Sequence, residues 1–364
     1  ISNTEVTSKA GGGGVFVDGG DTDGRFILTG GTISGNKASY GGGVYAYGDF
    51  DMRGGTISGN EVTSSGGGVY ASSSFTMENG KITGNTAKGN DGVGGGVYAN
   101  SAFTMKDGEI SNNTAEGSTS YSYTYGAGGG VFTCGQFTME DGTISGNQAT
   151  YGIRLPGFGG DNGGGVFVQS DDFIMTGGTI SGNSVGPYGH GGGVAVYENE
   201  SVASPSVCRV TISGGTISGN NAGELGGGGG LWTNASYVYV SGSVQITGNV
   251  QGGTKAAGAT VYTGGTASNF YNDNGYDVSP LEINTHLGGL KSDSQIGISV
   301  AENHLPYPGE NPVTVVTGAA ESDLEHFFAD AGEPYVLEYR ETTDAETGST
   351  IGTIVLTYPV THTH

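Results

Sequence analysis

The amino-acid sequence predicts an all-β fold, a right-handed parallel β-helix (a solenoid) that ends in irregular C-terminal coils and a cap. Two recurring motifs carry this prediction: Gly-Gly-Gly followed by an aliphatic and usually an aromatic residue, and Ile-x-x-Asn between successive copies. A self-similar unit of about 20–50 residues is typical of solenoid proteins. The chain has 76 glycines in 364 residues. These glycines are phased against hydrophobic residues, which favours a fold over disorder.

The glycine-rich motif predicts the first strand of each repeat. An aliphatic residue follows the glycines in successive copies, at Val15, Val44, Val69, Val97, Val131, Val166, Val194 and Leu231. Consecutive glycines allow tight turns with φ values that other residues rarely adopt, and they leave one strand edge free of side chains. We therefore interpret the repetition of glycines as chiefly structural.

A Phe-x-Met pattern predicts the second strand, because apolar and polar residues alternate in it as they do in a half-buried strand. All five methionines of the chain occupy this pattern, at Met52, Met77, Met105, Met139 and Met175. We expect them to stack in the core and not to bind a metal.

The Ile-x-x-Asn motif predicts the third and last strand of each repeat and the corner after it. Coils of a parallel β-helix stack about 4.8 Å apart, so equivalent residues lie above one another. Asn36, Asn60 and Asn147, which end three copies of the motif, are then expected to bond to the neighbouring backbone as an asparagine ladder.

The motifs divide the chain into two parts. Residues 1–263 hold the β-helix repeats, and residues 264–364 are expected to form irregular β coils and the C-terminal cap. In the second part, residues 281–284, 295–300, 312–316 and 353–357 have the pattern of strands, and residues 321–329 that of a short helix. A solenoid needs such a cap to cover its last open strand edge.

Composition and charge restrict the classes of partner. The chain carries 35 acidic and 12 basic residues, a formal net charge of −23, which excludes a nucleic-acid partner because phosphate binding needs the opposite sign. No stretch approaches the ~20 apolar residues of a membrane span, so direct membrane insertion is not expected. The first residues align with the middle of a later repeat, from which we expect a monomer within a longer multidomain chain.

The repeat resembles a family of bacterial surface proteins. Gly-Gly-Gly-Val together with Ile-x-x-Asn is similar to the short repeats of polymorphic outer-membrane proteins and, more broadly, to glycine-rich β-helix domains of adhesin-like surface proteins. The resemblance covers about residues 1–263. It implies an extracellular domain at a bacterial cell surface that acts in adhesion or binds a glycan or another host-surface ligand.

An outward row of aromatic residues is the first candidate binding surface. If Val44 points into the core, the residue after it points outward. In successive copies that next position holds Phe16, Tyr45, Tyr70, Tyr98, Phe132, Phe167, Ala195 and Trp232. Exposed rings can stack on the flat apolar faces of sugars, so the row predicts glycan binding. The alternative is that these rings pack in the core or under loops.

Long insertions near the middle of the chain are the second candidate surface. They follow the Asn corner in segments 114–127 and 148–162, with segment 184–190 beside them, and should stack into one wall. Their candidate ligand-binding residues are Tyr121, Tyr123, Tyr125, Tyr151, Arg154, Tyr188 and His190. Long loops on a rigid scaffold are where binding sites are often built. Surface insertions without a function are the alternative.

Carboxylates in these loops and at the opposite corner of the coil permit a second function. Asp161, Asp171, Asp172 and Glu198 are candidates for the acid and base of a glycoside hydrolase, which needs two carboxyl groups about 5–10 Å apart. A polysaccharide lyase fits less well, because only Arg154 lies in the loop wall. A passive stalk would need no site at all. We expect binding rather than catalysis, with glycoside hydrolysis of host or plant glycans as the alternative.

One acidic turn near the start of the chain is a candidate for binding calcium. Asp18, Asp21 and Asp23 place spaced oxygen ligands at a corner, but they lack the terminal glutamate of a helix-loop-helix calcium site. No other cofactor is expected.

Overall fold

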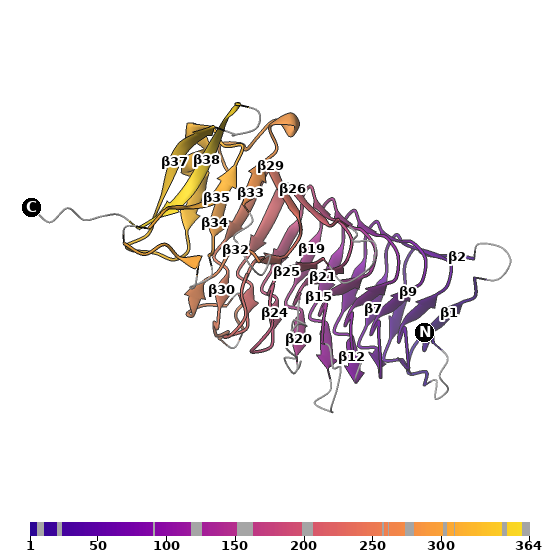
Figure 1. Cartoon of the computed structure of the whole chain (residues 1–364). Helices are drawn as coiled ribbons and strands as arrows, with labels where there is room; N and C mark the ends of the chain where they lie inside the picture. Colours follow the sequence, from indigo (N-terminus) through magenta and orange to yellow (C-terminus); the bar gives the residue numbers. More distant parts are fainter. Residues whose placement is uncertain are drawn as a thin grey trace, which may run out of the picture.

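The structure of the protein is a computed structural model. It describes residues 1–5, 11–19, 24–89, 92–117, 126–150, 163–198, 207–256, 258–260, 262–273, 280–300, 304–308, 310–343 and 348–358. Its strands coil around one axis and stack into an elongated parallel β-helix, with the N-terminal coils in indigo at one end and the C-terminal strands in yellow at the other (Figure 1). The predicted all-β parallel β-helix is confirmed. No helix among the described residues is long and apolar enough to cross a membrane.

The first strand of each coil follows the glycines and pairs in parallel with its equivalents above and below. These strands are β1 (Val15–Val17), β5 (Val44–Ala46), β9 (Val69–Ala71), β13 (Val97–Ala99), β17 (Val131–Thr133), β21 (Val166–Gln169), β25 (Val194–Tyr197), β28 (Leu231–Thr233) and β32 (Phe270–Asn272). The register puts glycine-motif residues in line, as in Val44↔Val69.

The second and third strands form two further faces of the coil. The second strands are β2 (Arg25–Leu28), β6 (Asp49–Met52), β10 (Phe75–Met77), β14 (Phe103–Met105), β18 (Phe137–Met139) and β22 (Phe173–Met175). The third strands are β3 (Thr32–Ser34), β7 (Thr56–Ser58), β11 (Lys81–Thr83), β15 (Glu109–Ser111), β19 (Thr143–Ser145) and β23 (Thr179–Ser181). In the next two coils, β26 (Arg209–Ser218) and β29 (Tyr237–Thr247) run through both faces.

A fourth strand in each coil corrects the prediction of three strands per repeat. The short strands β4 (Lys37–Ala38), β8 (Glu61–Val62), β12 (Thr86–Gly89), β16 (Thr114–Gly117), β20 (Gln148–Thr150), β24 (Ser184–Val185), β27 (Asn221–Ala222) and β30 (Val250–Gln251) form a separate sheet, which β31 (Thr266–Ala267) extends antiparallel to β30. Each begins just after the asparagine corner, and all but β30 bury a small apolar side chain, as at Ala87. Two to four residues are too few to show an alternation, so the pattern was missed.

The core fills the inside of the coil with equivalent residues stacked on one another. Phenylalanine rings of the second strands stack with centroids 4.5 to 5.8 Å apart, from Phe26 to Phe173. All five methionines are fully buried beside them. The predicted stacking of the methionines in the core is confirmed.

The asparagine ladder is also confirmed. The side-chain amide of Asn85 donates to Asn113 Oδ1 at 2.9 Å and to the carbonyl of Ile57 at 3.0 Å, and the backbone N–H of Asn85 donates to the same Asn113 Oδ1 at 3.0 Å. The asparagine-to-asparagine contacts repeat from coil to coil, at Asn36, Asn60, Asn85, Asn113, Asn147, Asn183, Asn220, Asn249 and Asn269. Each step satisfies buried backbone and side-chain donors at a corner where the strand ladder is interrupted.

Two glycines show why the triplet tolerates no other residue. Gly66 has φ +72°, and a Cβ there would lie 2.4 Å from the carbonyl oxygen of Val69. A Cβ on Gly67 would lie 2.3 Å from the carbonyl oxygen of Gly95 in the next coil. The first glycine therefore permits the turn, and the second permits neighbouring coils to approach.

Parallel pairing continues past the predicted division at residue 263. Phe270 and Tyr271 of β32 lie in register with Leu231 and Trp232. The last coils then comprise β33 (Leu281–Ile283), the 3₁₀ helix η1 (Thr285–Leu287), β34 (Gln295–Ile298), β35 (Val313–Thr317), the 3₁₀ helix η3 (Glu321–His326) and β36 (Phe327–Ala329). The antiparallel strands β37 (Val336–Thr343) and β38 (Thr350–Thr357), of which β38 pairs with β35, lie at the C-terminal end of the solenoid (Figure 1).

Candidate functional site

The aromatic row lies on the outside of the coil. Val44 is fully buried in the core, and the next residue, Tyr45, belongs to the opposite side of the strand. Along this side the rings follow one another in register from Phe16 through Phe167. The residues of the row thus face away from the core, as alternation in the first strand predicts.

Stacking covers the ring faces in the middle of this row, whereas Phe16 at its start is 50% exposed. Tyr70 lies between Tyr45 and Tyr98 with ring centroids 4.6 Å from each and planes inclined by 5° and 16°. Phe132 and Phe167 follow at 5.3 and 5.2 Å and are 7% and 6% exposed. A ring sandwiched in this way presents only its edge, whereas a sugar stacks on a ring face. The middle of the row is therefore a packed element rather than an open platform.

The type of residue at the outward position changes toward the C-terminal end of the row. Ala195 replaces a ring after Phe167, and Trp232 and Tyr271 occupy the next two coils. Trp232 is 7% exposed and packs against His190, with ring centroids 5.2 Å apart. Because Phe270 pairs with Ile298 and Ile298 with Ala329, the position after Tyr271 is held by Ser299 and the one after that by Asp330. A small residue follows the last ring.

A cleft opens where the aromatic row ends. It encloses about 550 Å³. Its lining comes from the turns before the last two glycine motifs, from β30, β31 and β32, and from the chain after β34 and β36. The residues are His190, Leu225, Gly226, Gly227, Gln251, Thr266, Ala267, Ser268, Tyr271, Ser299, Val300, Leu305, Asp330 and Ala331. Tyr271 supplies an aromatic wall, Val300 and Leu305 supply apolar surface, and Ser268, Gln251 and Asp330 supply polar groups.

Asp330 is held in place by the end of the asparagine ladder. Its carboxylate accepts hydrogen bonds from the backbone N–H of Asn269 at 2.7 Å, from the Asn269 side-chain amide at 2.6 Å, and from the Ser299 hydroxyl at 2.5 Å. Burial raises the pKa of Asp330, and these three hydrogen bonds oppose the shift. Each carboxylate oxygen has more than one lone pair, so the oxygens can accept further bonds from a ligand.

Burial also acts on the neighbouring tyrosine. The pKa of Tyr271 is raised to about 12, first by burial and then by the charge of Asp273. Tyr271 therefore stays protonated near neutral pH, where its hydroxyl can donate as well as accept a hydrogen bond. The cleft thus combines an uncharged aromatic side chain with one carboxylate.

Three of the predicted catalytic acids, Glu198, Asp171 and Asp172, lie together at a different corner and do not line the cleft. Glu198 is 6% exposed and accepts hydrogen bonds from the backbone N–H groups of Cys208 and Ser236 at 3.3 and 2.9 Å, and from the Ser236 hydroxyl. Asp172 accepts from the backbone N–H of Arg209 at 2.8 Å, and Asp171 from that of Asp172 at 2.7 Å. These bonds hold the chain on both sides of segment 199–206.

The same three carboxylates act on a buried thiol. Cys208 is fully buried, and burial together with the charges of Glu198, Asp172 and Asp171 raises its pKa to about 12. A thiol with so high a pKa is an inert structural group, not a nucleophile. Cys134 and Cys208 form no disulfide bond. The contacts of Glu198, Asp171 and Asp172 are those of structural acceptors, and their catalytic role stays a prediction.

Several predicted site residues lie outside the described part of the chain. They are Tyr121, Tyr123, Tyr125, Tyr151, Arg154 and Asp161 of the middle loops, and Asp21 and Asp23 of the calcium candidate. Among the described residues, Tyr188 is 42% exposed in the turn before His190. Over the same residues, no group of three or more His, Cys, Asp and Glu side chains could hold a metal ion. Asp18 is described, but it is not part of any such group.

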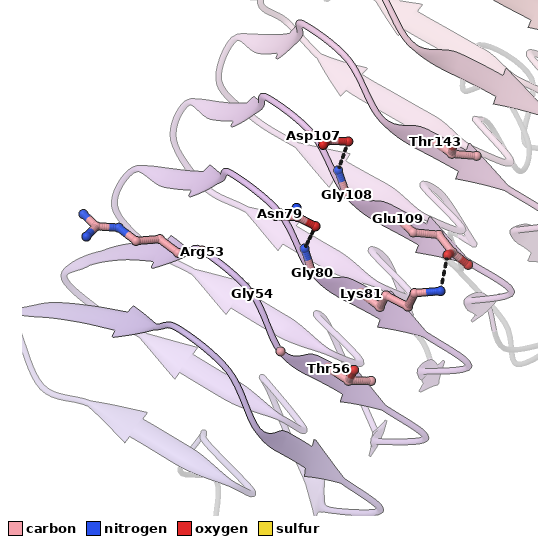
Figure 2. A pocket seen from close by; sticks show the side chains of 11 residues that line it. Arg53, Gly54, Thr56, Asn79, Gly80, Lys81, Asp107, Gly108, Glu109 and Thr143 are labelled. Atoms are coloured by element: carbon pink, nitrogen blue, oxygen red, sulfur yellow. Dashed lines mark hydrogen bonds and ion pairs between the residues drawn. The ribbon is translucent and has the colours of Figure 1, made fainter.

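A second, shallower groove crosses the outer corners between the second and third strands. It encloses about 650 Å³ and is lined by Arg53, Asn79, Lys81, Asp107, Glu109, Thr56, Thr143 and the glycines between them (Figure 2). Lys81 Nζ and Glu109 Oε2 are 2.7 Å apart, and Arg53 pairs with Glu78 at 3.6 Å. Some of the charged side chains that line this groove are therefore paired with other charged side chains. No aromatic ring among the described residues lines the groove.

Sequence reasoning missed the two central residues of the cleft. Tyr271 follows Asn269-Phe270, which repeats the inward–outward alternation of Val44-Tyr45 without the glycines. Asp330 follows Phe327-Phe328-Ala329 in the same way. Both residues could have been found by following the alternation of inward and outward residues along the later strands, because this alternation continues where the glycine motif does not.

The fold and the site define a class: a parallel β-helix protein whose outward aromatic row ends at a polar cleft beside the C-terminal cap. No protein-family model matches the chain, and neither a curated protein nor a solved structure matches it.

Proposed function

We propose that this chain is an extracellular glycan-binding domain of an adhesin-like bacterial surface protein and that the cleft at the end of the aromatic row binds the sugar. The observation that carries the proposal is the half-buried ring of Tyr271, which lines the cleft and is followed in its row by the small residue Ser299. Sugar recognition needs a ring face for the apolar side of a pyranose and polar groups for its hydroxyls. Tyr271, Ser268, Gln251 and Asp330 combine both.

Binding is favoured over hydrolysis by the number of carboxylates. Among the described residues that line the cleft, Asp330 is the one carboxylate. A two-carboxylate glycosidase needs a second, about 5–10 Å away. The predicted acids Asp171, Asp172 and Glu198 belong to the corner around Cys208 and line neither groove. The cell-surface location rests on the resemblance of the repeat to adhesin-like domains.

A glycan array with the intact chain tests the proposal, with bound ligand and released sugar measured on the same glycans. We expect retained ligand without cleavage. Tyr271→Ala should weaken binding of the selected neutral glycan at least tenfold, because it removes the stacking surface. Tyr47→Ala is the matched control: Tyr47 is a 50% exposed ring near the first coils, and its loss should leave binding unchanged.

Each other outcome overturns a defined part of the proposal. Released sugar would establish a glycoside hydrolase and direct attention to the carboxylates. Normal binding by a folded Tyr271→Ala variant would move the site away from the cleft. If no glycan on a broad array is bound, a passive stalk or a protein ligand would be favoured.

A further inference from the structure

We infer that the cleft selects glycans without negative charge and discriminates against sialylated, uronic-acid-containing and sulfated ones. This inference rests on the proposed function, because it specifies the ligand class of the same site. It depends on the charge and hydrogen-bonding capacity of the described lining.

The described lining offers an anion neither a lysine nor an arginine, and its one imidazole, that of His190, packs against the ring of Trp232. Its residues in the described part of the chain include one carboxylate, Asp330. Acidic sugars are usually bound through the guanidinium or ammonium groups that match a carboxylate. An anionic ligand in this cleft would instead face the Asp330 carboxylate at short range, where the low dielectric of a half-buried site strengthens repulsion between like charges.

Asp330 favours ligands that donate hydrogen bonds. Its oxygens already accept from Asn269 and Ser299, and an ionised carboxylate accepts but cannot donate. Hydroxyl groups of a neutral sugar meet this requirement, whereas a ligand carboxylate or sulfate brings only acceptors. Asp330 is fixed in position by the ladder, so it cannot swing away from an approaching anion without breaking three hydrogen bonds.

The charge of the surrounding chain acts in the same direction at longer range. The net charge is −23, and residues 264–364, which include Tyr271 and Asp330, carry 15 acidic and 2 basic side chains. A surface with this charge repels anions during approach, and salt screens the effect beyond about 10 Å at 0.1 M ionic strength. Local and long-range electrostatics therefore both act against acidic glycans.

The test is a set of matched glycans bound to the full chain. Neutral oligosaccharides, their sialylated counterparts, and the methyl esters of those sialylated glycans are compared by array and then by calorimetry at 0.05 and 0.5 M salt. We expect the sialylated forms to bind at least tenfold more weakly than the neutral ones. The methyl esters, which keep the size but lose the charge, should recover most of that loss.

Asp330→Asn gives a second measurement on the protein side. An asparagine there can accept through its side-chain carbonyl as the other ladder residues do, and it carries no charge. The difference in affinity between neutral and sialylated glycans should be smaller for this variant than for the natural chain. Because the methyl-ester comparison uses the unchanged protein, the inference can be contradicted even if the variant fails to fold.

The outcomes separate this inference from the proposed function. Equal or tighter binding of the sialylated forms, or esters that bind as weakly as the acids, would overturn the charge selectivity while leaving glycan binding in place. Failure of every glycan in the set to bind would overturn the proposed function, and the selectivity with it.

Discussion

At the scale of single residues, Asp330 links the cleft to the scaffold. It accepts the last donors of the asparagine ladder, the backbone and side-chain N–H groups of Asn269, and it lines the cleft. Gly297 makes this contact feasible, because a Cβ there would lie 2.4 Å from the Asn269 amide nitrogen and 2.7 Å from an Asp330 oxygen. The position of the carboxylate is thus set by the ladder and by the absence of a side chain at residue 297.

The raised pKa of Asp330 predicts a pH dependence of stability. A carboxyl whose pKa is higher in the folded than in the unfolded state binds its proton more tightly when folded. Its contribution to the free energy of unfolding therefore falls as pH rises from the unfolded pKa of about 3.9 through the raised folded pKa. We expect the unfolding free energy of the natural chain, relative to Asp330→Asn, to decrease over that window in urea titrations at a series of pH values. A relative increase would contradict the assignment.

Tyr70 tests whether the middle of the aromatic row is structural. Its ring stacks on Tyr45 and Tyr98 at 4.6 Å, and aromatic pairs contribute about 0.5–1.5 kcal/mol each beyond burial. Tyr70→Ala should lower the free energy of unfolding by about 1–3 kcal/mol from lost stacking alone, to which the lost burial of the ring adds; the loss is measured by urea denaturation, and glycan affinity should stay unchanged. Loss of affinity in a variant that remains as stable as the natural chain would instead place the ligand on the row.

At the scale of elements, the coil depends on ladders of identical residues. Core phenylalanines, methionines and corner asparagines repeat at one position per coil. Because each residue contacts its own kind above and below, the register is specified in every strand. This explains why the motifs alone predict the parallel β-helix, the buried methionines and the asparagine corner.

Asn147 is the residue with which to test the ladder. Its Oδ1 accepts from both the backbone N–H and the side-chain amide of Asn113 at 2.9 Å. Asn147→Ala leaves these two buried donors without their acceptor, which costs roughly 1–3 kcal/mol each. We expect the free energy of unfolding to fall by about 2–6 kcal/mol in total. Thr143→Ala, on the partly exposed outer face of the same coil, is the control and should change stability little; equal effects of the two substitutions would contradict the ladder's role.

The elements that the sequence did not predict share a physical cause. The fourth strand of each coil has few residues, so its Ala or Val gives no periodic signal, and pairing with neighbouring coils stabilises it instead. The cleft likewise arises from register between segments far apart in the sequence, such as Tyr271, Ser299 and Asp330. A sequence pattern predicts which residues of one strand are buried. The fourth strands and the cleft depend instead on which strands pair with one another.

At the scale of the whole molecule, the parallel β-helix continues beyond the last glycine triplet. Glycine triplets end before β31, yet β32, β33, β34 and β36 continue the parallel pairing. Phe270 and Ile298 take over the inward positions that Val and Leu hold earlier. The antiparallel strands β37 and β38 lie only beyond these coils. The candidate site therefore belongs to the transition between regular coils and the cap, where equivalent positions cease to carry equivalent residues.

The proposed function places the sugar in the cleft at the end of the aromatic row, on a rod of stacked parallel coils. The most direct test of this account is a crystal structure of the chain with a neutral glycan selected on the array. The account predicts a sugar ring against Tyr271 with a hydroxyl within hydrogen-bonding distance of Asp330. A glycan bound along Tyr45 to Phe167, or at the middle loops, with the cleft empty, would contradict it.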